Sequence, residues 1–492
     1  MQNPSGDVWY PGARQSRDTT VDAVVIVPGI MGSELLDADT GDLLWGLKPA
    51  MLRRALGRKG GLQPLHATDA ELEGSGPVRV RPSALLRIPA WVPLLHGIEP
   101  YHDLAQMVDD AVVDPAAVLK FPYDWRLPVE HNGRLLAQAA RRHLEAWTAT
   151  VAATPELRAR CEERMPQLVL VAHSMGGLVT RAALHHHRDL QPDTRTVITL
   201  GTPFLGSAKA AVMLNGGRRE GGVRGRVLDH LQALAATLPG VHDLLPDYRC
   251  VDEGLEVSRL TPSAVAGIGG NSELARAAAD FQLRMRSDPT TVLPDHRAVV
   301  GVAQPTVQSI RIEGGVVHPQ CRTFKVDKAG ELVRNSHGIP QVWDRWGDGT
   351  VYRDAASHTA GQPVWMPVQH GALAKHGQAL KYVHGVLTEY DGYDGPPMGP
   401  GDLGLDLPDE GVSAGRPWEL RLTGRDSPVA VTCEIVDAET GARVARPRFS
   451  GRDGGLVAMV ELREPGLYRV AARVGETAPV TQLLMAFGPD QE

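Results

Sequence analysis

A serine on a tight turn is the residue of this sequence most clearly placed to do chemistry. Ser174 lies in AHSMGG (Ala172–Gly177), between the apolar run QLVLVA (Gln167–Ala172) and the helix-like segment GLVTRAAL. A serine between a buried strand and a helix stands on a strained turn that exposes its hydroxyl above a sheet, and small flanking residues let the two elements approach. Ala172 replaces the usual first glycine of this turn. Ser174 is therefore predicted to be a nucleophile.

An attacking serine needs a histidine base, and the base needs a carboxylate to orient it. In the fold class that carries a nucleophilic serine on such a strand-to-helix turn, the order along the chain is serine, acid, histidine. Asp348 lies in WGDGTV (Trp346–Val351), where flanking glycines let the turn present its carboxylate inward, whereas the competing Asp344 lacks glycine neighbours. His370 follows the expected last strand VWMPVQ and precedes an apolar-periodic helix. Asp348 is therefore the predicted acid and His370 the predicted base.

Other histidines are weaker candidates for the base. His376 is the second choice, but His376 and His384 are expected within the final helix. His173, beside the nucleophile, is expected to be structural. His185–His187 is expected on an exposed helix face, and three consecutive helical residues point in different directions and cannot hold one metal ion. We expect neither a metal nor an organic cofactor.

An oxyanion formed during acyl transfer needs two backbone N–H donors. One is expected from Met175, the residue after the nucleophile. The other is expected from VPGIMGSEL (Val27–Leu35), where Gly29 and Gly32 allow the loop to turn its amides inward. Ile30, just past the Pro-Gly turn, is the predicted second donor.

Read together, these residues resemble the lecithin:cholesterol acyltransferase and lysosomal phospholipase A family of α/β-hydrolases. PYDWR is the most specific motif, because the others occur in lipases generally. The resemblance covers about residues 20–390, and it implies the same roles for Ser174, Asp348, His370 and Ile30. The matching motifs are VVIVPGIMGSEL (Val24–Leu35), FPYDWRLP (Phe121–Pro128), LVLVAHSMGGLVTR (Leu168–Arg181), TLGTPFLGS (Thr199–Ser207) and GDGTV (Gly347–Val351).

The resemblance also implies a lid that handles lipid in the segment after Glu34, including Trp45. Family members from secretory compartments clip this lid with a disulfide. The first cysteine of this chain is Cys161, so the predicted lid has no such clip. Extracellular action and cholesterol-type substrates are therefore not expected.

Within the predicted lid, LLRIPAWVPLL (Leu85–Leu95) is apolar but interrupted by Pro89 and Pro93. The two prolines argue against a regular helix. Two interpretations remain open: a loop packed on the core, or an apolar lid over a lipid-facing cleft. In the second, Trp91 and Leu94 contact substrate or a membrane surface.

Apolar runs that alternate with helix-like segments predict an α/β-hydrolase fold, with a mostly parallel sheet covered by helices on both faces. This domain is expected over residues 1–392, with the lid at about 45–100 and a mostly helical cap at about 208–294. A Gly- and Pro-rich linker follows at 393–412, and 413–492 reads as a small antiparallel, immunoglobulin-like β-sandwich. The expected strands of the sheet are Ala23–Val27, Gln167–Ala172, Thr196–Leu200, Ala298–Ala303 and Val307–Ile312, and the expected helices are Tyr101–Val112, Asn132–Ala152 and Gly177–His186.

Composition sets the broad class of the protein. Of 492 residues, 42% are hydrophobic and 22% charged, as in ordinary globular proteins. The net charge of −7 argues against a nucleic-acid partner. No apolar run reaches the roughly 18–20 residues that span a bilayer, and the first twenty residues do not read as a secretory signal. We therefore expect a cytoplasmic protein.

The sequence thus predicts a serine-dependent hydrolase or acyltransferase acting on lipid acyl esters through an acyl-enzyme. Its partners would be a lipid or ester substrate, a membrane surface contacted peripherally, and a protein bound by the sandwich. Two alternatives stay open. One is an esterase for small soluble esters, and the other is a catalytically silent hydrolase-fold protein that binds or signals.

Overall fold

The computed structural model describes residues 19–46, 62–73, 75–90, 97–161, 164–215, 222–327, 330–358, 361–389, 403–452 and 454–488. The predicted lid residues Trp91 and Leu94 lie outside these ranges.

A six-stranded parallel sheet forms the centre of the molecule, in the order β15-β10-β7-β6-β1-β5. Every residue of β1 and β6 is buried, because helices cover both faces, and such strands read as continuous apolar runs. The strands are β1 (Ala23–Val27), β5 (Val118–Lys120), β6 (Leu168–His173), β7 (Thr194–Leu200), β10 (Arg297–Gly301) and β15 (Val364–Met366).

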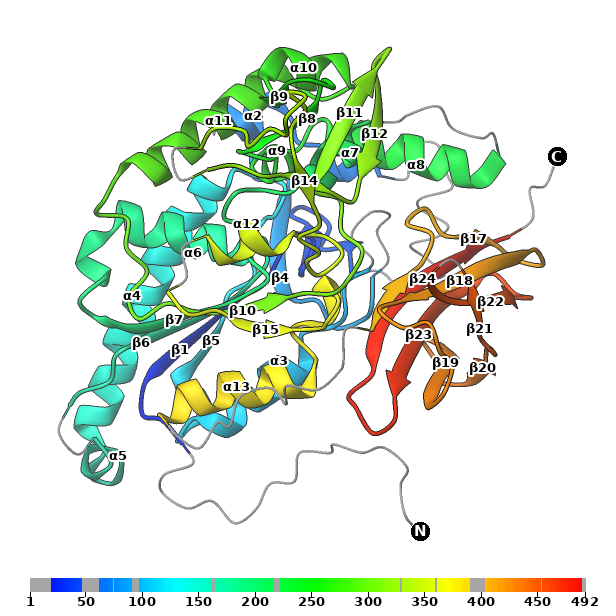
Figure 1. Cartoon of the computed structure of the whole chain (residues 1–492). Helices are drawn as coiled ribbons and strands as arrows, with labels where there is room; N and C mark the ends of the chain where they lie inside the picture. Colours follow the sequence, from blue (N-terminus) through cyan, green and yellow to red (C-terminus); the bar gives the residue numbers. More distant parts are fainter. Residues whose placement is uncertain are drawn as a thin grey trace, which may run out of the picture.

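Two pairs of helices cover the sheet (Figure 1). On one face α3 (His102–Ala111) packs with α13 (Gly377–Thr388), and on the other α4 (Val129–Ala153) packs with α6 (Met175–His186). The predicted α/β-hydrolase class is therefore confirmed. The expected run Val307–Ile312 is not a strand of this sheet, however, as β11 (Ser309–Glu313) pairs with β12 and β8 instead.

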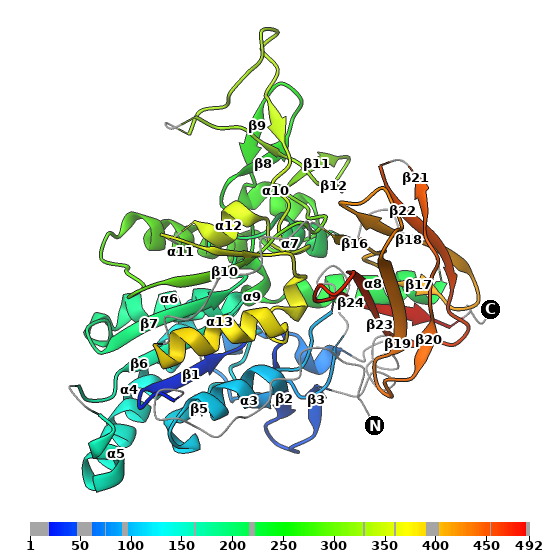
Figure 2. The same ribbon diagram turned by 60° about the horizontal axis from the view of Figure 1, so that its bottom comes forward.

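A cap follows β7 and contains strands as well as the helices that were expected. Its sheet has the order β12-β11-β8-β9 and lies above the central strands in the view of Figure 2. The cap also contains the short antiparallel pair β13-β14, and β13 contacts β8. The cap elements are α7 (Ala208–Leu214), α8 (Gly222–Ala235), α9 (Pro239–His242), β8 (Arg249–Asp252), β9 (Val257–Arg259), α10 (Pro262–Gly267), α11 (Ser272–Ser287), β11, β12 (Val316–Gln320), β13 (Thr323–Phe324) and β14 (Val342–Trp343).

A three-stranded sheet of order β3-β2-β4 begins directly after β1 in the chain. It contains β2 (Ser33–Asp37), β3 (Leu43–Trp45) and β4 (Val80–Leu85), and α2 (Asp69–Glu73) lies between β3 and β4 in the chain. Part of the predicted lid is therefore regular β-structure. The short helices α5 (Pro155–Ala159), α12 (Arg353–Ser357) and the 3₁₀ turn η4 (His370–Ala372) complete the hydrolase domain.

Residues 403–488 form a β-sandwich, called the sandwich below. Its sheets have the orders β16-β18-β22-β21 and β17-β24-β23-β19-β20. The first strand lies within the range expected as a linker, and Leu403, Leu405 and Leu407 are buried in the sandwich core. The strands are β16 (Gly404–Asp406), β17 (Val412–Ser413), β18 (Pro417–Thr423), β19 (Val431–Asp437), β20 (Arg443–Ala445), β21 (Ser450–Arg452), β22 (Gly455–Glu461), β23 (Gly466–Val474) and β24 (Val480–Phe487).

Strand β24 belongs to two cores at once. Val480, Leu484 and Ala486 are buried in the sandwich core, whereas Leu483, Met485 and Phe487 are part of the core of the hydrolase domain. Successive strand residues point to opposite faces, so one face of β24 packs on each domain. Figure 1 shows the sandwich, in orange and red, beside the hydrolase domain.

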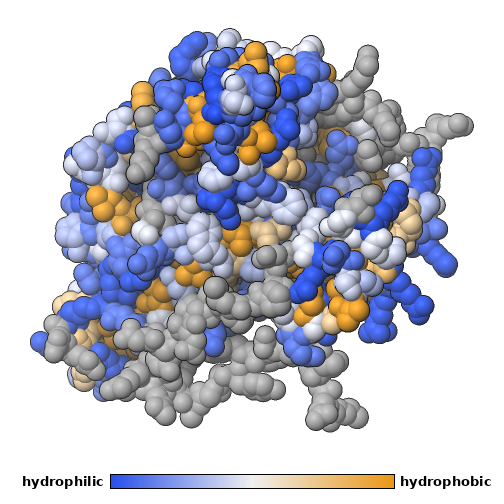
Figure 3. Space-filling view, viewed as in Figure 1, coloured by the Kyte–Doolittle hydropathy of each residue, from blue (hydrophilic) through white to orange (hydrophobic). Residues whose placement is uncertain are grey.

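Among the described residues no helix is both long enough and apolar enough to cross a membrane. On the face in Figure 3, the described apolar side chains lie in separate patches between hydrophilic ones.

Candidate active site

The structure brings together the three residues predicted to form the triad. His370 Nδ1 lies 2.7 Å from Asp348 Oδ2, and His370 Nε2 lies 2.8 Å from Ser174 Oγ. A carboxylate only accepts hydrogen bonds, so Nδ1 carries the proton and donates to Asp348. Nε2 is then the acceptor for the Ser174 hydroxyl. This is the arrangement in which a histidine can take a proton from a serine.

Ser174 stands on a strained turn between β6 and α6. Its φ of 53° and ψ of −127° lie in a region that non-glycine residues rarely adopt. The neighbouring glycines make room for the turn, since a Cβ on Gly176 would lie 2.4 Å from the Pro28 carbonyl oxygen and one on Gly177 would lie 2.0 Å from Thr202 Oγ1. The predicted turn geometry is thus present, with Ser174 at the position of a nucleophile elbow.

The turn after Trp346 presents the carboxylate of Asp348, the predicted acid. Thr350 and Val351 donate backbone N–H groups to Asp348 Oδ1, which leaves Oδ2 for His370. The Thr306 hydroxyl oxygen accepts the amides of Gly347 and Gly349 on either side. Asp348 is only 1% exposed, and its carboxylate is held by its own turn.

Glycines also let neighbouring loops approach the acid–base pair. A Cβ on Gly301, at the end of β10, would lie 2.4 Å from Asp348 Cβ. One on Gly201, where φ is +61°, would lie 2.9 Å from Asp348 Oδ2 and 3.1 Å from His370 Nδ1. Larger residues at these positions would displace the acid or the base.

The loop after β1 lies directly against the nucleophile. A Cβ on Gly29 would be 2.9 Å from Ser174 Cβ, and Met31 takes a left-handed φ of 59°. Within the described ranges the Ile30 amide has no backbone acceptor, and Met175 is the first residue of α6, where an amide has no acceptor within the helix. Both predicted oxyanion donors therefore lie on backbone beside Ser174, and their role stays a prediction.

The PYDWR motif supports this loop. Tyr123 donates its hydroxyl to the Pro28 carbonyl at 2.9 Å, and its amide donates to Ser33 Oγ at 3.0 Å. Trp125 Nε1 donates to the Ser33 carbonyl at 3.2 Å. The aromatic residues of the motif thus hold both ends of the loop that carries Ile30.

The charged residues of the motif fasten it to α2. Arg126 is 1% exposed and pairs with Asp124 and with Glu71 Oε1, both at 2.8 Å. Glu71 also pairs with Arg79. Although burial opposes ionisation, the Arg126 and Arg79 guanidinium groups lower the pKa of Glu71 to about 2. Glu71 is therefore ionised throughout the neutral range.

A buried hydrogen-bond chain connects the loop after β1, strand β6 and His370. The Gly29 amide donates to the Tyr101 hydroxyl at 2.8 Å, which lies 2.7 Å from His173 Nδ1, and His173 Nε2 lies 3.0 Å from the His370 carbonyl. Burial lowers the pKa of His173 to about 3, so its ring is neutral. Since a carbonyl only accepts, Nε2 carries the proton, and Tyr101 donates to Nδ1. The prediction that His173 is structural did not extend to Tyr101, whose sequence position gives no signal of this contact.

The remaining candidates are not part of the hydrogen-bonded series of Ser174, His370 and Asp348. Asp344 accepts hydrogen bonds from Gln308 and the Trp346 amide, and His376 precedes α13, which contains His384. His185 and His186 are partly buried, beside Asp288 and Glu130 respectively. Within the described ranges, no three His, Cys, Asp or Glu side chains form a group that could hold a metal ion.

Trp45 is buried rather than exposed at a cleft. Its ring is 1% exposed, packs edge-to-face on Trp125 with centroids 5.5 Å apart, and donates Nε1 to the Met31 carbonyl. These contacts make it a further support of the loop after β1. A substrate-handling role for Trp45 stays a prediction.

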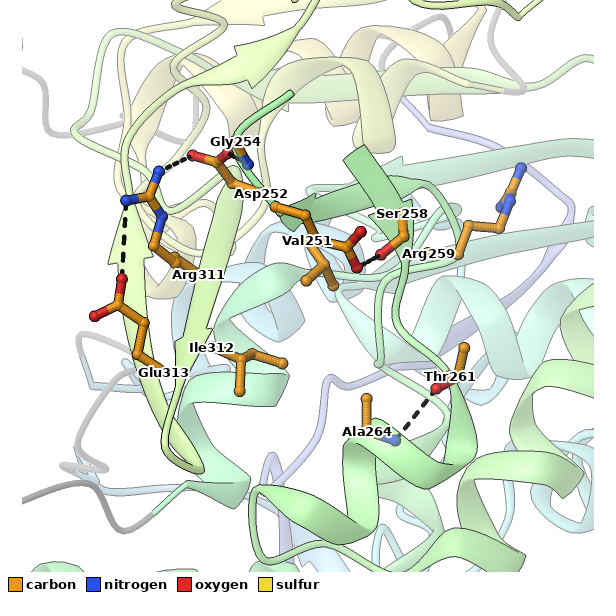
Figure 4. A pocket seen from close by; sticks show the side chains of 11 residues that line it. Val251, Asp252, Gly254, Ser258, Arg259, Thr261, Ala264, Arg311, Ile312 and Glu313 are labelled. Carbon is orange, nitrogen blue, oxygen red and sulfur yellow. Dashed lines mark hydrogen bonds and ion pairs between the residues drawn. The ribbon is translucent and has the colours of Figure 1, made fainter. Parts of the chain in front are cut away.

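A pocket of about 680 Å³ lies in the cap and contains no triad residue (Figure 4). Arg311 pairs with Asp252 and Glu313, and the Ser258 hydroxyl donates to Glu253. Arg259 pairs with Asp247, which does not line the pocket. The charged side chains of the pocket thus have partners, and no residue of the candidate triad lines it.

Residues 94–256 match the family model of lecithin:cholesterol acyltransferase. Over this segment the chain is similar to the lecithin:cholesterol acyltransferase family. The resemblance predicted from the sequence is thereby confirmed. The acyltransferase-like segment contains PYDWR and Ser174, whereas Asp348, His370 and the loop with Ile30 lie outside it. No curated protein is significantly similar to the chain in sequence.

Solved structures of low identity also align with the chain. The structure of the Tle4-Tli4 complex matches at 15% identity and a TM-score of 0.44, covering 75% of this chain and 99% of its own. The Bacillus licheniformis lipase BlEst2 in its propeptide form matches at 12% identity and a TM-score of 0.33, covering 94% and 93%. Phospholipase PlaB from Legionella pneumophila matches at 10% identity and a TM-score of 0.27, covering 81% and 88%.

Proposed function

We propose that this chain is a serine-dependent hydrolase or acyltransferase for lipid acyl esters, with Ser174 as nucleophile, His370 as base and Asp348 as acid. The observation that carries the proposal is the continuous hydrogen-bonded series Ser174 Oγ, His370 Nε2, His370 Nδ1 and Asp348 Oδ2. The strained backbone of Ser174 adds to it, since strain of this kind clusters at functional sites.

In the first half-reaction His370 Nε2 takes the hydroxyl proton as Ser174 Oγ attacks the ester carbonyl carbon. Asp348 stabilises the resulting imidazolium through the proton on Nδ1. The Ile30 and Met175 amides hold the oxyanion of the tetrahedral intermediate. His370 then gives its proton to the departing alkoxide, and the acyl group remains on Ser174.

In the second half-reaction His370 deprotonates the acceptor that attacks the acyl-enzyme. Water as acceptor releases a carboxylic acid, and an alcohol as acceptor yields a new ester. Both outcomes use the same residues and intermediate. The similarity of residues 94–256 to the lecithin:cholesterol acyltransferase family supports an acyl lipid as the substrate of either reaction.

Fluorophosphonate labelling of the whole chain tests the proposal. The reagent should modify Ser174, and Ser174→Ala should abolish both labelling and hydrolysis of a short acyl nitrophenyl ester. Loss of a triad member typically lowers turnover on the order of 10⁴–10⁶-fold. Ser258→Ala, which removes a serine of the cap pocket, is the matched control and should retain activity.

A folded Ser174→Ala protein that keeps a tenth or more of the wild-type turnover would refute the serine mechanism. A wild-type chain that is neither labelled nor active would favour the silent, binding alternative. Mass spectrometry of products from mixed glycerophospholipids, with and without an added alcohol, then separates hydrolysis from acyl transfer. Activity on nitrophenyl esters without activity on any lipid would favour the small-ester alternative.

A further inference from the structure

The sandwich contacts the hydrolase domain at the segments that carry the acid and the base. Three buried glutamines connect these segments: Gln304 after β10, Gln369 directly before His370, and Gln482 in β24. None of them is more than 4% exposed. A buried amide is expensive to leave without partners, so their mutual contacts restrict where these segments can lie.

Gln369 is the centre of this cluster. Its Nε2 lies 3.0 Å from Gln482 Oε1, 3.1 Å from Gln304 Oε1 and 3.3 Å from the Leu405 carbonyl, and its two hydrogens are shared among these three acceptors. Two of these three acceptors, Gln482 and Leu405, belong to the sandwich. The residue before the base is therefore held mainly by the sandwich.

Gln304 extends the cluster to the acid. Its backbone amide donates to the Gly347 carbonyl at 3.0 Å, next to Asp348. Its side chain donates Nε2 to the Leu403 carbonyl and accepts the Leu405 amide. Gln304 thus connects the acid turn and the first strand of the sandwich.

Two charged contacts lie beside the glutamines. Arg469 of β23 pairs with Glu99 through both carboxylate oxygens at 2.6 Å, and Glu99 is 4% exposed. On the acid side, Lys209 Nζ donates to the Gly349 carbonyl at 3.0 Å and pairs with Asp409 of the sandwich at 3.1 Å. The sandwich is therefore held by one ion pair on the side of the base and by a different one on the side of the acid.

Close backbone packing completes the base side. A Cβ on Gly97 would lie 2.6 Å from Leu483 Cβ of β24, and a Cβ on Gly371 would lie 2.1 Å from the Gly97 carbonyl. Strand β24, Gly97 and the turn with His370 are therefore stacked without space between them. A shift of β24 would be transmitted to His370.

We propose that the sandwich positions the acid and the base for the reaction, and that Gln482 is its principal positioning residue. The inference rests on the proposed function of the triad. The role of the sandwich in the reaction is to maintain two distances, the one from Ser174 Oγ to His370 Nε2 and the one from His370 Nδ1 to Asp348 Oδ2. Displacements of about 1 Å at a reacting group can cost on the order of 100-fold in rate.

The test compares Gln482→Met with wild type in the full chain, using a nitrophenyl butyrate assay and fluorophosphonate labelling. Methionine has a similar length but offers no amide oxygen to Gln369. We expect kcat and the labelling rate per active site to fall about 10- to 100-fold, with KM unchanged. Gln482→Glu keeps an acceptor oxygen and should restore most of kcat.

Ile435→Val is the matched control, because Ile435 is buried in the sandwich core and is not part of the hydrolase core. It should lower the melting temperature and leave kcat per active site unchanged. A Gln482→Met protein that folds and keeps wild-type kcat would overturn the proposal. If Gln482→Met does not fold, Asp409→Asn is the second test, because it weakens the contact of the sandwich with Lys209 on the side of the acid. A lower kcat then supports positioning by the sandwich, and an unchanged kcat refutes it.

Failure of the proposed function has a different signature. In that case the wild-type chain is not labelled at Ser174 and does not hydrolyse the ester. A wild-type chain that is active, with Gln482→Met equally active, refutes the positioning role alone.

Discussion

Replacing Tyr101 with phenylalanine removes a single oxygen from the buried hydrogen-bond chain that joins the loop after β1 to His370. The hydroxyl accepts the Gly29 amide at 2.8 Å and lies 2.7 Å from His173 Nδ1. Tyr101 and His173 are 1% and 3% exposed, so water does not readily replace the lost contacts. The substitution leaves one donor and one acceptor unsatisfied in the interior.

Each unsatisfied buried polar group costs about 1–3 kcal/mol, so Tyr101→Phe should lower the free energy of unfolding by about 2–6 kcal/mol. Gly29 also loses the contact that holds it against Ser174. We therefore expect kcat for a nitrophenyl ester to fall about 10- to 100-fold, with little change in KM.

Urea unfolding and steady-state kinetics on the same preparation measure both effects. Tyr468→Phe is the matched control, because the Tyr468 hydroxyl donates to the Glu464 carbonyl within the sandwich. It should lower stability by less and leave kcat unchanged. If Tyr101→Phe unfolds at the wild-type urea concentration and keeps wild-type kcat, the hydrogen-bond chain does not support the site.

Three further predictions concern the acid, the PYDWR motif and pH. Asp348→Asn should lower kcat about 10⁴-fold, because an amide N–H₂ facing His370 Nδ1 favours the wrong tautomer; a turnover within tenfold of wild type would refute this role. Arg126→Met should cost about 3–5 kcal/mol by leaving the buried Asp124 carboxylate without its ion-pair partner. Arg79→Met, on the more exposed partner of Glu71, should cost under about 1 kcal/mol, and equal denaturation midpoints for the two variants would contradict this. Burial raises the pKa of Asp243 to about 7, so the native state holds a proton that the unfolded state releases near pH 4. The stability that this bound proton contributes is lost as pH rises from about 4 to 7. Asp243→Asn should remove this loss, which is at most about 1.4 kcal/mol per pH unit. If the free energy of unfolding depends on pH in the same way in the wild-type protein and in Asp243→Asn, Asp243 does not cause the loss.

Ser174, Asp348 and His370 could be named as triad candidates from the sequence, because the first two have a local signature and His370 lies between the expected last strand and the final helix. Ser174 is surrounded by small residues between a buried strand and a helix, and Asp348 is flanked by glycines. Such signatures report backbone requirements within a few residues, which is information that the linear chain carries. The parallel sheet was predictable for the same reason, since strands buried on both faces read as apolar runs.

An apolar run indicates that a strand is buried, but it does not indicate which strand it pairs with. The run Val307–Ile312 was expected in the central sheet, yet β11 pairs in the cap with β12 and β8. Likewise, Gly- and Pro-rich composition predicted a linker at 393–412, where Leu405 and Leu407 are buried in the sandwich core. Alternating leucines between turn residues are too short a signal to outweigh composition.

The sequence by itself determined the nucleophile, the acid and the base as candidates and the class of fold that carries them. Only the tertiary structure decided what holds them in place: Tyr101 against His173, and Gln482 against Gln369. These pairs are separated by 72 and 113 positions along the chain, and neither tyrosine nor glutamine has a local pattern that announces a buried partner. Contacts of this kind exist only after the strands and loops have packed, because packing places the two side chains in one interior and removes the water that would otherwise satisfy them.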